Sequence, residues 1–247
     1  SHVVVETNVL QADDGSASRP WLVDQLTLAP GQSLRSMLND QDFEKLQKIV
    51  LDTGLKLEQL NRLKPAFAAT NIVNARLNAF GFSRKWGMEQ QFLERAGSRT
   101  IVPLETTKQQ IALLAQAGLE IQLRILRESL VSDTKLESMV TELVSAWWHG
   151  DHVAIENSFH YDSENSIGYE QFQRELLDKR NFLMAAKIIE LLNFPGHYFV
   201  LIGAAHLTGS NSIINILQER GITLQRITND GSKQINENLI SKENYES

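Results

Sequence analysis

The chain has 247 residues, 42% hydrophobic and 22% charged, so it is long enough to bury a core and has the composition of a globular protein. A net charge of −6 and the lack of any Lys- and Arg-rich run argue against nucleic acid or an anionic membrane as the main partner. The absence of cysteine excludes disulfides, thiolate metal sites and cysteine nucleophiles. No apolar run reaches the roughly 18–20 residues that span a bilayer.

Four short apolar runs rich in β-branched residues predict strands at 3–6, 99–105, 198–203 and 222–227. Three of these runs show little polar alternation, which is typical of a sheet covered on both faces. We therefore expect an α/β fold, with a central mostly parallel or mixed sheet flanked by helices. Because the first run begins almost at residue 1, we also expect the natural protein to have a segment before Val3.

Helical periodicity dominates between the strand-like runs. Segment 11–36, with scattered Gly, Ser, Asp and Pro, is predicted to be a loop. Helices are predicted at 39–54, 57–80 with a break or first turn at Pro65, 88–96, 107–117, 119–131, 134–148, 168–192 and 210–220. For the helix at 134–148, the Ser, Asp and Thr of "SDTKLE" are the candidate N-caps, and Glu137 follows Thr134 by three residues. We expect one domain over 1–231, with an all-helical insertion at about 107–192, and a polar tail at 232–247.

Three predicted strands end in side chains that suit chemistry. Glu6 ends "VVVE", Glu105 ends "TIVPLE", and His206 follows the glycine exit of "FVLIGAAH" at Gly203. Ligands collect at the carboxyl ends of strands in open α/β sheets, where these residues could bind a metal or act as a general base. The alternatives are a helix-capping role for His206 and a helix N-terminal role for Glu105.

Other polar residues carry weaker signals. His149 and His152 end an amphipathic helix, where a cation complements the helix dipole, and we interpret them as helix-end residues. Arg180 and Asn181 border an apolar stretch and could hold an anion or pair with a carboxylate. Nucleotide-binding and serine-hydrolase motifs are absent from the sequence, so no nucleotide cofactor is expected.

Several stretches taken together resemble the TraB/GumN family, to which the eukaryotic Tiki metalloproteases are similar. They occur in the family's order and spacing over most of 3–227: "LKPAFAA" (63–69), "WGMEQQFLERA" (86–96), "TIVPLETTKQQIALL" (100–114), "WWHGD" (147–151), "LLDKRNFLMAAKI" (176–188) and "FVLIGAAHLTGSNSIINILQERGITLQRI" (199–227). The most specific parts are "LET", "RN" and "GAAHL". On this basis the chain is identified as a member of the family.

The resemblance implies an α/β fold with a divalent-metal hydrolase site, built from two Gly-x-x-His motifs and intervening glutamates. The second motif matches Gly203 to His206, and the glutamates match Glu6 and Glu105. The resemblance thus implies His206, Glu105 and Glu6 as metal ligands and catalytic groups for Mn, Co or Zn. Arg180 and Asn181 match the family's Arg-Asn pair and, with Gly203, are expected to bind substrate. Family members often work in the periplasm, at a membrane or outside the cell, so we favour such a location.

Two departures from the family pattern bear on activity. The first Gly-x-x-His is absent from this sequence, and Glu89 stands where the family usually has an aspartate. A catalytic metal generally needs about three protein ligands, so we expect weaker metal binding, and whether this chain is an active enzyme is left open by its sequence.

Three functional hypotheses follow. The first is a peptidase that acts on a peptide or protein. The second is a non-catalytic peptide- or signal-binding protein on the same fold, and the third is an interaction domain built on the helical insertion. The apolar surface of the long helices leaves room for a homodimer.

Overall fold

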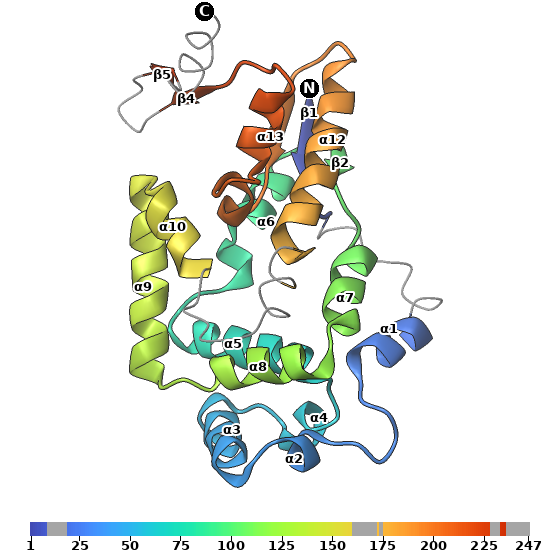
Figure 1. Ribbon diagram of the computed structural model, residues 1–247, viewed down its shortest axis with the longest axis vertical. Coiled ribbons are helices and arrows are strands. Elements are labelled where there is room, and N and C mark those ends of the chain that lie inside the picture. The colour runs from blue at the N-terminus through green and yellow to red at the C-terminus, as the bar shows by residue number, and fades with distance from the viewer. Residues whose placement is uncertain (9–18, 160–171, 173–174, 228–232, 236–247) are drawn as a thin grey trace, which may run out of the picture.

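The computed structural model describes residues 1–8, 19–159, 172, 175–227 and 233–235 (Figure 1). The central sheet has three strands, in the order β2-β1-β3. They are β1 (His2–Val5), β2 (Thr100–Pro103) and β3 (Tyr198–Leu201). Both pairings are parallel, and Val4 lies opposite Val102 on one side and Val200 on the other. The predicted α/β fold is confirmed, with a fully parallel sheet.

The helices surround this small sheet and extend well beyond it. In chain order they are α1 (Arg19–Leu26), α2 (Leu34–Met37), α3 (Asp40–Thr53), α4 (Leu57–Leu60), α5 (Pro65–Ala79), α6 (Met88–Glu94), α7 (Thr107–Gln116), α8 (Leu119–Ser129), α9 (Asp133–His149), α10 (His152–Phe159), α12 (Arg180–Leu192) and α13 (Ile213–Glu219). Two 3₁₀ turns and one π-helical turn complete the set: η1 (Arg84–Trp86), η3 (Ala204–Leu207) and η2 (Glu175–Lys179).

Apolar packing covers both faces of the sheet, because successive side chains of a strand point to opposite sides. Val4 packs with buried residues of α12 and α13, among them Met184 and Ile213. Val3 and Val5 pack on the other face, in a cluster that includes Leu93 of α6. The near-continuous apolar sequence of β1 is therefore explained by burial on both faces, as the sequence predicted.

A separate apolar cluster lies away from the sheet, at the bottom of Figure 1. It joins α2, α3, α4, α5 and α8, which we call the helical body. Leu34, Leu46, Ile72 and Leu126, all fully buried, form its centre. The helical spacing of apolar residues in α3 predicted this burial directly.

The prediction of a loop over 11–36 is wrong for the part that the structure describes. Helices α1 and α2 lie there, while residues 11–18 are outside the described residues. Pro20 is the second residue of α1, a position that proline tolerates. Helix α2 is capped by a box formed between Ser33 and Ser36. Serine in place of the usual Glu or Gln at the third helical position obscured that start signal.

The fourth predicted strand, 222–227, does not join the central sheet. Only Gln225–Ile227 is a strand, β4, and it pairs antiparallel with β5 (Lys233–Ile235) in a separate ribbon. All three residues of β4 are exposed, as expected of a ribbon outside the buried parallel sheet. Strand β5 lies within the predicted polar tail, and the domain boundary at 231 stays a prediction.

Helix boundaries differ from the predictions by a few residues. Pro65 is in the first turn of α5, as predicted, and splits the segment 57–80 into α4 and α5. Helix α9 is capped by Ser132, one of the three predicted candidates, whose side chain accepts from the Lys135 N–H. The start of the helix predicted at 168 falls mostly outside the described residues. None of the helices that the structure describes is long and apolar enough to cross a bilayer.

Candidate functional site at the carboxyl ends of the strands

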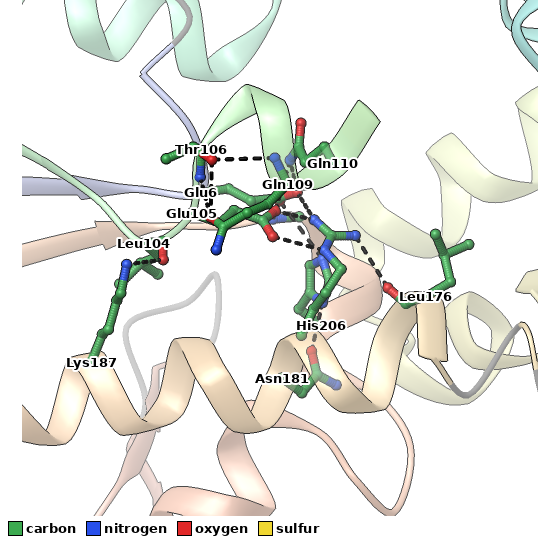
Figure 2. Close-up of polar contacts among 12 residues, drawn as sticks. Glu6, Leu104, Glu105, Thr106, Gln109, Gln110, Leu176, Asn181, Lys187 and His206 are labelled. Carbon is green, nitrogen blue, oxygen red and sulfur yellow. Dashed lines mark hydrogen bonds and ion pairs between the residues drawn. The ribbon is translucent and has the colours of Figure 1, made fainter. Parts of the chain in front are cut away.

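Parallel pairing brings the three predicted strand-end residues to one edge of the sheet. Glu6 directly follows β1, Glu105 comes two residues after β2, and His206 lies in the turn after β3. The Glu105 N–H donates to the Glu6 carbonyl at 2.9 Å, which extends the β1–β2 pairing beyond the strands. Figure 2 shows the three side chains converging with residues of α7 and α12. We call this group, together with Arg180, Asn181 and Gln110, the strand-end cluster.

Arg180, the first residue of α12, joins the two carboxylates. Its Nε donates to Glu105 Oε2 at 3.0 Å, and its Nη2 contacts both Glu105 Oε1 and Glu6 Oε1. Its Nη1 donates to the carbonyl of Leu176 at 3.2 Å. The bond to Glu105 is thus a two-pronged guanidinium–carboxylate pair, a strong and directional arrangement. Charges that are far apart in the chain are held together by this one side chain.

Gln110 is a member of the cluster that the sequence analysis missed. Its Nε2 donates to Glu105 Oε1 at 2.7 Å and to Glu6 Oε1 at 3.0 Å. Helix α7 places it there, because Thr106 caps the helix through a box with Gln109. The signal was available in "LETTKQQ", where a capped helix starts beside Glu105 and turns its first polar residues back toward the strand end.

The His206 ring is fixed by Asn181. His206 is 3% exposed, and its Nδ1 lies 2.5 Å from Asn181 Oδ1. The amide nitrogen of Asn181 donates to the carbonyl of Asn211 at 2.8 Å, so the amide oxygen must be the group that faces the ring. An oxygen accepts, hence Nδ1 carries the proton. The neutral ring therefore has its lone pair on Nε2.

The lone pair on Nε2 is directed toward Glu6. His206 Nε2 lies 3.8 Å from Glu6 Oε2. Gly203 lies beside both groups and donates its N–H to Glu6 Oε2 at 3.4 Å. A Cβ at this position would be 3.4 Å from the carboxylate oxygen and 3.7 Å from His206 Cδ2. Glycine thus keeps the space between the carboxylate and the imidazole free of side chain.

The surroundings of Glu6 favour its ionised form. Burial alone would raise the pKa of Glu6, but the His206 ring when both of its nitrogens carry a proton, the positive charge of Arg180 and the Gly203 N–H together lower it to about 2. Burial likewise acts to lower the pKa of Arg180, but its bonds to Glu105 and Glu6 outweigh burial and raise that pKa. Both groups are therefore charged throughout the neutral range.

Glu89, at the start of α6, is influenced by the negative charge of Glu6 in the strand-end cluster. Burial and the negative charge of Glu6 raise the pKa of Glu89, and the backbone of Thr7 and the charge of Arg84 oppose that rise. Its Oε1 is buried and has no hydrogen-bond partner among the described residues. The structure thus places the acid of "GME" close enough to Glu6 to feel its charge.

Two other predicted positions behave as helix-end residues. His149 Nδ1 bonds to the carbonyl of Ser145 at 2.8 Å, one turn earlier in α9, and His152 begins α10. Within the ranges that the structure describes, no group of three or more His, Asp or Glu side chains is arranged to hold a metal ion. The interpretation of His149 and His152 as helix-end residues agrees with this placement.

The donor atoms of the strand-end cluster fit one half of a metal site. Two ligands, each about 2.1 Å from an ion, lie at most about 4.2 Å apart, and the 3.8 Å between His206 Nε2 and Glu6 Oε2 falls within that limit. Glu105 does not offer a comparable atom, since Arg180 engages both of its oxygens. It could join such a site only if the guanidinium moved.

Comparison with known proteins identifies the class. The sequence model of the TraB/PrgY/gumN family matches residues 1–226, so the chain belongs to this family. Among curated proteins, the chain is similar to "Uncharacterized protein YbaP" of Escherichia coli K12, with 21% identity over 218 residues. That match covers 85% of this chain and 76% of the relative, and the protein of the same name from Shigella flexneri matches equally. No solved structure matches the chain.

Proposed function

We propose that this chain is a divalent-metal-dependent hydrolase that acts on peptides, with the strand-end cluster as its active centre. One observation carries the proposal: a buried imidazole nitrogen with a free lone pair faces an ionised carboxylate oxygen at the carboxyl edge of a parallel sheet. His206 and Glu6 are the first ligands, and Glu105 is the third. A divalent ion held by these residues would lower the pKa of a bound water to about 7 and so would supply hydroxide at neutral pH.

The remaining residues position these groups. Asn181 holds the His206 ring in the tautomer that leaves Nε2 free, a role that supporting residues commonly have around metal-binding histidines. Gly203 leaves room beside Glu6 for a substrate carbonyl. Arg180 supplies a permanent positive charge, carried on a side chain that can move, to orient the substrate. Hydrolysis of an amide needs a base for the attacking water and an acid for the leaving nitrogen, and Glu105 is the carboxylate in reach for that transfer.

Metal-binding calorimetry with Mn²⁺, Co²⁺ and Zn²⁺ tests the proposal. The unaltered chain should bind one ion, weakly because only two donor atoms face each other. His206→Gln, which keeps a polar side chain of similar size, should lower the affinity by about tenfold or more. His149→Gln removes a histidine from the end of α9 and serves as the matched control, with unchanged affinity. Equal binding by all three proteins would remove His206 from the site and overturn the proposal.

A peptide-binding role without catalysis is the second candidate. The observation in its favour is that Arg180 and Gln110 already satisfy Glu105 and Glu6 Oε1, so the cluster is stable without an ion. A binding protein should capture peptides from a library equally well with and without a chelator. Loss of capture on chelation, together with cleavage when metal is restored, would favour the hydrolase.

A further inference from the structure

The Arg180 guanidinium occupies the place that a cation bridging Glu6 and Glu105 would take. Its Nη2 contacts Oε1 of both carboxylates, so one nitrogen lies between the two acidic groups. The side chains are largely removed from water, with exposed fractions of 15% for Arg180, 21% for Glu6 and 10% for Glu105. Two carboxylates buried this closely need a counter-charge, and the chain itself provides it.

Even with that counter-charge, Arg180, Glu6 and Glu105 together carry a net negative charge. One guanidinium balances one of the two carboxylates, and Gln110, the other donor to these oxygens, is uncharged. A divalent ion would balance both. Arginine cannot resolve the competition by losing its proton, because it stays charged in proteins. The guanidinium and a divalent ion therefore cannot share the two Oε1 atoms.

We propose that Arg180 is a resident counter-cation that a divalent ion must displace from Glu6 and Glu105 before Glu105 becomes available as the third ligand. This inference rests on the proposed function, since it concerns the same ion. The Arg180 contacts then block the ligand atoms of the metal-free chain, and we call this autoinhibitory arrangement the clasp. Binding of the ion releases the guanidinium, which can then pair with an anionic group of the substrate.

The backbone around Arg180 suits such a movement. Arg180 begins α12 immediately after the π-helical turn η2, and such turns are uncommon and often found at functional sites. Its Nη1 donates to the Leu176 carbonyl one turn earlier. This bond lies outside the carboxylate pair, so it gives the guanidinium an acceptor after the carboxylates are lost.

Calorimetry of Mn²⁺ binding to Arg180→Met tests the clasp. The variant should bind Mn²⁺ at least about tenfold more tightly than the unaltered chain, since the three charge-assisted contacts of Arg180 with the carboxylates no longer have to be broken. The measurement should be made near ~pH 8, where protons compete little for the carboxylates left without a partner. Mn²⁺ should also raise the melting temperature of the variant more than that of the unaltered chain, because tighter binding gives more stabilisation.

Lys187→Met is the matched control. Lys187 is a second cation of α12, and it donates to the Leu104 carbonyl at 2.6 Å without touching a carboxylate of the cluster (Figure 2). Removing it changes the net charge equally, so it reports any general electrostatic effect. Its Mn²⁺ affinity should stay close to that of the unaltered chain.

A small-molecule cation gives a second readout. In Arg180→Ala, added ethylguanidinium should occupy the vacated position and weaken Mn²⁺ binding, with no such effect on the unaltered chain. Circular dichroism checks that each variant folds. If Arg180→Met folds poorly, the measurement on Arg180→Ala still tests the proposal.

The outcomes separate the two proposals. Equal Mn²⁺ affinity in Arg180→Met and the unaltered chain, with binding lost in His206→Gln, overturns the clasp and supports the metal site. Equal tightening by Arg180→Met and Lys187→Met also overturns it, because bulk charge would then be the cause. If none of the proteins binds Mn²⁺, both the clasp and the metal site are overturned.

Discussion

The helical body and the strand-end cluster each contain a largely buried arginine, and the two are used differently. Arg76 of α5 is 2% exposed and donates to Asp133 Oδ1 at 2.7–2.9 Å and to the Ser129 carbonyl at 2.9 Å. Its one carboxylate partner has a side chain that is 58% exposed to water. Arg180 has two carboxylate partners, and both are mostly buried.

This difference distinguishes the Arg76 contact, which stabilises the fold, from the Arg180 contact, which leaves a buried negative charge unbalanced. Arg76 and Asp133 balance in charge, and the open carboxylate keeps part of its hydration, so removing Arg76 leaves Asp133 solvated. At Arg180 the negative charge exceeds the positive, and little water reaches it. Burial of like charges costs folding free energy, and such sites are where proteins place function rather than stability.

Arg180→Met should produce the largest stability change. Two close carboxylates would lose their buried counter-charge, and we expect a loss of about 3–5 kcal/mol in the free energy of unfolding at neutral pH. Adding Glu105→Gln to this variant removes one of the stranded charges and should restore part of the loss. Urea unfolding of both variants measures the effect. A double variant no more stable than Arg180→Met would show that the loss comes from packing.

The pH dependence of Glu6 should give the next largest effect. Its pKa falls from 4.5 in the unfolded chain to about 2 in the folded chain, so the folded state binds fewer protons between these values. The resulting stabilisation, about 3 kcal/mol, is complete above pH ~4.5 and is lost as the pH falls toward ~2. Glu6→Gln should flatten this part of the stability curve. Parallel curves for the two proteins would contradict the low pKa.

Arg76→Met should cost less, about 1–3 kcal/mol, because Asp133 stays in contact with water once the pair is broken. The loss should respond little to pH between about 5 and 8, and Mn²⁺ affinity should not change. Urea unfolding at two pH values tests this expectation. A loss as large as that of Arg180→Met would remove the distinction between the two arginines.

Thr106→Ala should have the smallest effect. Thr106 caps α7 and so helps to place Gln110, and losing such a cap typically costs about 1 kcal/mol. Thr107→Ala, at the exposed first position of the same helix, is the matched control and should change little. If the two substitutions cost the same, the capping box contributes nothing measurable to the cluster.

The sequence predicted the site in part because parallel strands impose a common edge. Once β1, β2 and β3 were recognised, Glu6, Glu105 and His206 had to meet, and the family resemblance added Arg180 and Asn181. The capping signal in "LETTKQQ" places the start of α7 beside Glu105, but the contacts of Gln110 and the two-pronged contact of Arg180 with Glu105 could not be predicted, since they depend on the rotation of α7 and α12 about their axes. The apolar period of α3 fixed its buried face, but the mixed composition before residue 36 concealed α1 and α2.

The strand order has a consequence for how the chain folds. The central strand β1 comes first in the sequence, and its partners follow about 98 and 196 residues later, as the register of His2 with Thr100 and Tyr198 shows. During synthesis the apolar "VVV" segment must therefore wait until Pro103 has emerged before its first neighbour is complete, and until most of the chain has emerged before both are. Pairings between such distant residues are slow to form. The strand-end cluster is thus assembled late, and β1 is the segment most exposed to misassociation while it waits.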